Sequence, residues 1–332
     1  MAESGPVCLA VAQHDAALAA LAHGRLQDAR LLGTAAVDAA RATFGPDSPD
    51  LANVILTCAD IEETAGDFGT ARALAERAAG IAEPLAETCD PALMSLWVDI
   101  ELMCARMLLN HAAFELADAR LAAALRISRR ILAADDHTVL SIHNLRGVTA
   151  KYRCRFEDAA THYEHIRVVL DVEPVRDRQA LAVLLHNLGG LAHARGRIAE
   201  GLAHAQRGLE FRIDAVGDDD PDVACDLNAI GALHHDSGDT TAAVSCYQRA
   251  LRIFESALGA DHYEVGMTCA NLAVSTAESD TTEARRLYER SLRILQSTLG
   301  TSHPDVALVQ HNLAVLPAGA GDAESSSQRT RR

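Results

Sequence analysis

Apolar residues recur every three or four positions along most of the chain, which is the period of an amphipathic α-helix. The pattern is clearest between residues 220 and 259. Asp220 and Pro221 are typical of a helix N-terminus, and Gly238 is typical of a helix end, where glycine adopts a left-handed backbone at little cost. The stretch is therefore predicted to form two helices joined by a turn. Neither helix buries its apolar face alone, so the pair needs neighbours of the same kind.

The helix pair repeats along the chain at nearly constant intervals. A small residue marks one position of the second helix in seven copies: Ala29, Ala71, Ala117, Ala159, Gly201, Ala243 and Ala284. Successive copies are 42, 46, 42, 42, 42 and 41 residues apart. The glycines at the turns keep the same register: Gly24, Gly66, Gly196 and Gly238. The sequence therefore predicts about seven helix-turn-helix repeats.

The predicted repeats fill residues 9–316. In the first two repeats, helices are expected near residues 9–22, 26–43, 49–64 and 68–88. Later repeats are expected near residues 92–133, 136–171, 177–215, 221–258 and 262–299, and a lone helix near 304–316 is expected to cap the array. The 46-residue step marks one weak joint near 84–91, and residues 171–176 mark another. Residues 1–8 and 317–332 carry no apolar period and are expected to be a disordered lead and tail.

The second helices carry a recognisable pattern of small and aromatic residues. It reads Ala243, Tyr247, Ala250 in one copy and Ala284, Tyr288, Ser291 in the next. This resembles the tetratricopeptide repeat (TPR), and the long period with segments such as HNLAVL (311–316) is similar to the kinesin-light-chain type. The resemblance covers roughly residues 11–316. It implies an all-α solenoid, a right-handed TPR superhelix, that holds a protein or peptide segment in its concave groove.

The resemblance also implies which residues face the ligand, because the first helix of each TPR lines the groove. Val274 is one such position, and the polar ones are Asn144, Lys151, His186, Asn187, His193, Asn228, His235, Asn271, His311 and Asn312. The asparagines would hold the backbone of a peptide, because a carboxamide both donates and accepts hydrogen bonds. The other interpretation is that they bond to neighbouring helices or to water.

The net charge of −16 argues against a nucleic-acid partner, because such proteins need a basic surface. Acidic groove positions in the first three repeats, Asp60, Glu63 and Asp99, favour a basic or mixed peptide. The sequence leaves the oligomeric state open, and a dimer surface near Trp97 is one alternative.

The chain is expected to be cytoplasmic. The eight cysteines form no CxxC pair, and several occupy apolar helix positions, which is typical of a reducing compartment. The N-terminus lacks the basic region of a signal peptide, and no apolar run is long enough to span a bilayer. We therefore expect no membrane contact.

Catalytic motifs are not apparent, and neither a cofactor nor a metal is expected. The sequence contains no GxSxG, P-loop or HExxH motif. One alternative is an enzyme or accessory subunit in which His186, His193 and His235 converge on zinc. Another is a regulatory sensor that tightens around a signalling peptide. His162 and His165 are expected on the surface of a second helix.

Overall fold

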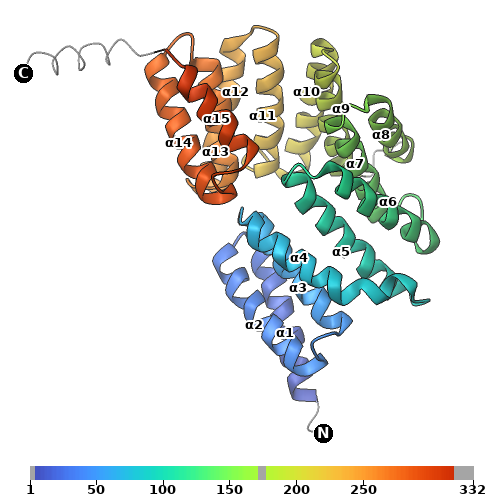
Figure 1. Cartoon of the computed structure of the whole chain (residues 1–332). Helices are drawn as coiled ribbons and strands as arrows, with labels where there is room; N and C mark the ends of the chain where they lie inside the picture. The colour runs from blue at the N-terminus through green and yellow to red at the C-terminus, as the bar shows by residue number, and fades with distance from the viewer. Residues whose placement is uncertain (1–3, 171–176, 318–332) are drawn as a thin grey trace, which may run out of the picture. The chain divides into compact units, whose positions relative to one another are not determined.

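The computed structural model describes residues 4–170 and 177–317 (Figure 1). Within these ranges it contains fifteen α-helices, one 3₁₀-helix and no strand. The chain divides into two compact units, Met1–Pro174 and Val175–Arg332, and each is described by itself. The predicted all-α solenoid of helix pairs is confirmed.

The N-terminal unit contains four helix pairs. These are α1 (Ser4–Ala22) with α2 (Leu26–Phe44), α3 (Pro49–Thr64) with α4 (Phe68–Ala82), α5 (Pro91–Asn110) with α6 (Phe114–Ile131), and α7 (His137–Tyr152) with α8 (Phe156–Leu170). Consecutive helices from α1 to α8 pack against each other. Each helix from α2 to α7 therefore packs against the helix before it and the helix after it.

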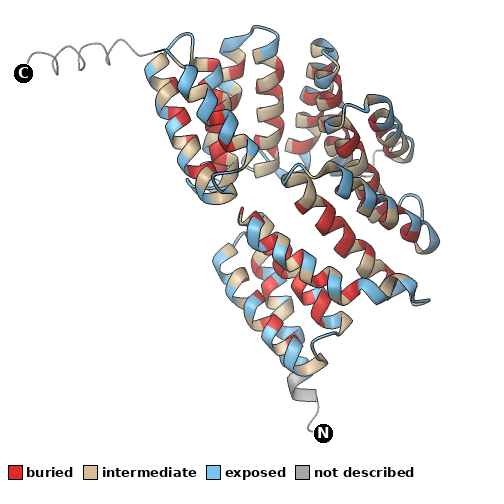
Figure 2. Ribbon diagram, viewed as in Figure 1, coloured by how far each residue is buried: buried red, intermediate tan, exposed pale blue. Residues whose placement is uncertain are grey.

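The C-terminal unit contains three pairs and a final helix. These are α9 (Arg178–Ala194) with α10 (Ile198–Val216), α11 (Pro221–Asp236) with α12 (Thr240–Leu258), α13 (Tyr263–Thr276) with α14 (Thr281–Leu299), and α15 (Pro304–Val315). Figure 2 shows that buried residues lie on the helix faces that meet neighbouring helices. The largest buried cluster runs from Val223 to Val309 through α11–α15. The core is thus a row of helix contacts rather than one central mass.

Helix ends follow the sequence signals. Asp220 accepts a hydrogen bond from the backbone N–H of Asp222, and Pro221 begins α11. Gly238 has φ +85°, the left-handed turn that the sequence predicts. Two turns of this type lack glycine: Ala112 (φ 54°) and Cys154 (φ 56°) occupy the equivalent positions. Left-handed backbone costs a residue with a Cβ about 1–2 kcal/mol, so these two turns are the strained ones.

The structure differs from the prediction in two places. The first helix begins at Ser4, so most of the expected disordered lead is helical, and residues 1–3 lie outside the described part. The expected long helix over 68–88 ends at Ala82, and a 3₁₀-helix follows at Glu83–Glu87. Pro84 explains the change, because proline removes a backbone donor and clashes with the preceding turn of an α-helix. The expected joint at 171–176 and the tail beyond residue 317 lie outside the described residues.

Candidate polar face on the first helices

The first helices of neighbouring repeats approach one another in the C-terminal unit, α9 against α11 and α11 against α13. Side chains join them at one repeating interval. His186 bonds to Asp226 at 2.7 Å and Asn228 bonds to Thr268 at 2.8 Å, both 40 residues apart. His235 and Ser275 are also 40 residues apart and lie 3.1 Å from each other. We call α9, α11 and α13 with these side chains the polar face. It joins predicted groove residues of α9 and α11 to partners on the next first helix that the sequence did not predict.

A buried ion-pair network joins the polar face to α10. The carboxylate of Asp226 is 2% exposed and receives hydrogen bonds from Nδ1 of His186 and from Nε of Arg212, the latter at 3.2 Å. Arg212, on α10, is 4% exposed and also donates to Asp222 at 3.1 Å. A buried charge is tolerated only where it is paired and hydrogen-bonded. The network therefore fixes the orientation of the His186 ring.

His193 lies about two helical turns after His186 on α9. Its Nε2 donates to Asp236 of α11 at 2.6 Å. The Asp236 side chain is about half exposed, and that of His193 is 29% exposed. His186, His193 and His235 thus have three different partners, and the hypothetical convergence on zinc is not seen. Among the described residues, no group of three or more His, Cys, Asp or Glu side chains is placed to hold a metal.

The predicted groove asparagines have different environments. Asn187 is 8% exposed, so little of its amide reaches the surface. Asn228 donates to Thr268, whose hydroxyl donates in turn to the Glu264 carbonyl. Asn271 is half-buried on α13. These positions favour the interpretation that Asn228 bonds to a neighbouring helix.

The remaining predicted groove residues are spread over the two units. His311 is exposed on α15, and Asn312 is hydrogen-bonded to the Tyr288 hydroxyl. Asn144 and Lys151 lie on α7 in the N-terminal unit, both half-buried. Burial lowers the pKa of Lys151, and its ammonium lies 5.0 Å from the centre of the Tyr152 ring.

Two of the three acidic groove positions of the N-terminal unit share one arginine. Arg106 of α5 contacts Asp60 at 3.1 Å and Glu63 at 2.8 Å, both on α3. Burial, together with nearby Asp136, raises the pKa of Asp99 to about 6. The sequence did not predict the role of Arg106, Arg212 or Asp226. For Arg106 and Asp226, a partner 46 and 40 residues away, close to one repeat length, is the signal that would have identified them. Arg212 is only 14 residues from Asp226 and gives no such signal.

Three histidines in the fourth repeat form a cluster that the sequence did not predict. Nδ1 of buried His143 lies 3.0 Å from Nδ1 of His162, and its ring stacks on His165 at 4.0 Å between centres. His162 and His165 are half-buried, so the prediction that they are surface residues is wrong. Burial, followed by the nearby charges of His165, His162, Arg129 and Arg146, lowers the pKa of His143 to about 3. The ring is therefore neutral in the folded protein.

This cluster predicts a loss of stability at mildly acidic pH. A histidine that is held neutral in the fold and has a pKa near 6.5 when unfolded takes up a proton on unfolding. Its stabilising contribution is therefore complete above pH 6.5 and is lost as the pH falls towards 3. Between pH 7 and 5 the loss should be roughly 1–2 kcal/mol for His143.

We expect His143→Gln to flatten the dependence of the urea unfolding midpoint on pH. The control is His137→Gln, because His137 is exposed at the start of the same helix. The prediction is contradicted if His143→Gln and His137→Gln change the pH dependence of the urea unfolding midpoint equally.

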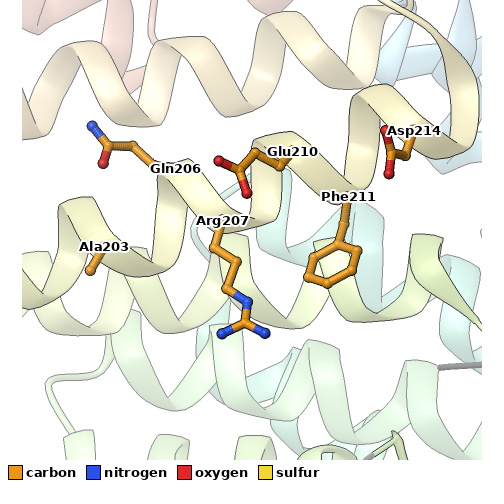
Figure 3. Close-up of a pocket in the computed structure, with 6 residues that line it drawn as sticks. All are labelled: Ala203, Gln206, Arg207, Glu210, Phe211 and Asp214. Carbon is orange, nitrogen blue, oxygen red and sulfur yellow. The ribbon is translucent and has the colours of Figure 1, made fainter. Parts of the chain in front are cut away.

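Two hollows, one in each unit, are lined by residues that do not belong to the polar face. Figure 3 shows the larger, about 520 Å³, lined by Ala203, Gln206, Arg207, Glu210, Phe211 and Asp214 of α10. The guanidinium of Arg207 lies 5.8 Å from the centre of the Phe211 ring. The second, about 270 Å³, lies between α2, α3 and α4, where Arg30 is paired with Glu62. Burial raises the pKa of Cys58 at this hollow to about 11, so its sulfur is a thiol rather than a nucleophilic thiolate.

All eight cysteines are free, and Cys58, Cys104 and Cys269 are buried in helix contacts. Over the described ranges, the helices are too short or too polar to cross a bilayer.

Comparison with known proteins gives one family. A model described as a tetratricopeptide repeat matches residues 8–83 and 180–256, and a second model with the same description matches residues 266–305. No curated protein sequence matches the chain.

Solved structures share the fold at low identity. The Rap conjugation gene regulator of the plasmid pLS20, in complex with the Phr* peptide, is 12% identical with a TM-score of 0.61, over 88% of this chain and 76% of that one. BtubC (BKLC) from P. vanneervenii is 24% identical with a TM-score of 0.50, over 70% and 91%. A putative kinesin light chain from Podospora anserina is 14% identical with a TM-score of 0.46, over 64% of this chain and 99% of that one.

Proposed function

Because the chain belongs to the tetratricopeptide repeat family, we propose that it is a non-catalytic, protein-binding scaffold whose C-terminal unit holds a peptide segment against the polar face. The observation that carries the proposal is the row of partly exposed polar side chains on α9 and α11, namely His186, Asn228 and His235. Each is held in place by a buried partner on the next first helix, one repeat away. A surface fixed in this way loses little conformational entropy when a ligand binds.

The chemistry of the polar face suggests the kind of ligand. Its exposed groups are imidazoles, amides and the Asp236 carboxylate, with Val274 (37% exposed) as an apolar contact. Such a surface suits a polar or basic peptide better than an acidic one, because no lysine or arginine is among the groove residues of α9, α11 and α13. His193 and His235 would contact ligand side chains, while Asn271 offers an amide for the ligand backbone.

A matched pair of substitutions tests this location. Val274 on α13 and Val216 at the end of α10 are 37% and 36% exposed, but only Val274 belongs to the polar face. We expect Val274→Arg to remove a partner captured from the native lysate by the full chain, because the new guanidinium occupies the ligand's position. Val216→Arg should retain it. Retention of every captured partner by Val274→Arg would place binding elsewhere.

A peptide-responsive sensor is the second candidate. The similarity to the Rap regulator bound to the Phr* peptide favours it, although at 12% identity the similarity concerns the fold. A scaffold and a sensor differ in their response: a sensor should become more compact in solution scattering when its peptide is added, and a rigid scaffold should not.

A further inference from the structure

The last helix, α15, exposes a face that the other first helices bury. Every first helix has a small residue at one shared position: Ala17, Ala59, Ala105, Gly147, Gly189, Gly231, Ala273 and Ala314. The first seven are buried, whereas Ala314 is exposed. Seven residues earlier, Ala182, Ala224 and Gly266 are buried, and their counterpart Ala307 is exposed.

The buried members show what normally covers this face. A Cβ on Gly231 would lie 2.7 Å from Cε1 of Tyr247, which belongs to the second helix of the same repeat. A Cβ on Gly266 would lie 3.0 Å from Ile294 and Leu295 of α14. The small residues therefore let the second helix approach closely. In α15 the same two positions remain small, and no second helix follows among the described residues.

The residues after α15 do not have the composition to fill this place. Residues 317–332 read PAGAGDAESSSQRTRR, with no aromatic or large aliphatic side chain. The second helices α12 and α14, by contrast, bury Tyr247, Phe254, Leu287 and Tyr288. Residues 317–332 therefore do not supply the aromatic and large aliphatic side chains that the other second helices bury.

The exposed positions of α15 are mostly apolar, with Gln310 and His311 as the polar ones and no exposed Asp, Glu, Lys or Arg among them. Leu308 is 59% exposed and Val315 is 64% exposed, beside Ala307, His311 and Ala314. Its opposite side is already covered, because Val306 and Val309 are buried in the core cluster of the C-terminal unit. An apolar helix face with one covered side is the kind of surface that accepts an amphipathic helix.

We propose that α15 docks an amphipathic helix of a partner protein, in the place that second helices occupy in the preceding repeats. The partner helix carries a small residue, an aromatic or large aliphatic residue four positions later, and a small residue three positions after that, as in Ala243, Tyr247 and Ala250. This docking surface is separate from the polar face and does not depend on the proposed peptide binding.

A peptide copied from the chain itself is the probe. A fluorescent peptide with the sequence of residues 280–299, the N-cap and helix of α14, should bind the full chain saturably in an anisotropy titration. Ala307→Arg and Ala314→Arg should each weaken binding at least about tenfold, since a guanidinium on this face blocks close approach. Both positions are exposed, so the fold should tolerate them.

Ala257→Arg is the matched control, because Ala257 is an exposed helical alanine on α12. It should bind the peptide as the wild type does. Absence of saturable binding, or equal binding by Ala314→Arg and wild type, would overturn the proposal. So would a wild-type dimer in sedimentation that Ala314→Arg converts to monomer, because a second copy would then be the occupant.

Discussion

Replacing Arg212 by methionine should lower the free energy of unfolding by about 3–5 kcal/mol. Arg212 and Asp226 are 4% and 2% exposed, and they bond to each other at 3.2 Å. Removal of the guanidinium leaves the Asp226 carboxylate buried with only His186 as a partner. A buried charge without sufficient partners carries most of its desolvation penalty. The unfolding midpoint in urea, followed by circular dichroism, measures the change.

Two further variants give this prediction its controls. Arg212→Met/Asp226→Leu should recover most of the loss, because an apolar pair can replace a buried ion pair at little cost. Arg178→Met removes one partner of an exposed pair, Arg178–Asp214, with side chains 55% and 59% exposed. Its effect should be below about 1 kcal/mol. If Arg212→Met destabilises no more than Arg178→Met, the network is not the support that we describe.

Gly231→Leu is expected to destabilise the C-terminal unit by about 3 kcal/mol. Three ring atoms of Tyr247 lie 2.7–2.9 Å from the position of a Cβ on Gly231, and Tyr247 is 3% exposed. Because the Tyr247 ring is buried and cannot move aside, α11 and α12 would have to separate. Differential scanning calorimetry of the full chain should show the loss as a lower Tm.

Gly80→Leu provides the comparison, because Gly80 lies on α4 with no atom within 4 Å of its Cβ position. Leucine there should be neutral or stabilising by roughly 0.5–1 kcal/mol, since glycine is a poor helix former. A Gly231→Leu protein with the Tm of Gly80→Leu would show that the two helices are not closely packed at Gly231.

The helices were predictable because their signals are local. Proline and aspartate at 220–221, glycine at 238 and the apolar period lie within a few residues of the structure that they determine. The same logic failed at Pro84, where the apolar pattern continues although proline prevents an α-helix. Ala112 and Cys154 stand where the repeat register calls for glycine, and they adopt the left-handed turn nevertheless.

The polar face was predictable in position but not in its bonds. The register of the repeats places His186, Asn228 and His235 on first helices, as the structure has them. Their partners Asp226, Thr268 and Ser275 depend on how closely the next repeat approaches, which is a tertiary property. The sequence gives no local sign that His143, His162 and His165 come together, because that contact joins two helices through the fold.

The most direct test of the central claim is photo-crosslinking from the polar face. A photoreactive phenylalanine is placed at Val274 or, as the control, at Val216, and the full chain is irradiated in native lysate. We predict a discrete crosslinked partner from position 274, lost in an Asn271→Ala background, and none from position 216. Crosslinks to the same partner in the same yield from both positions would contradict binding at the polar face.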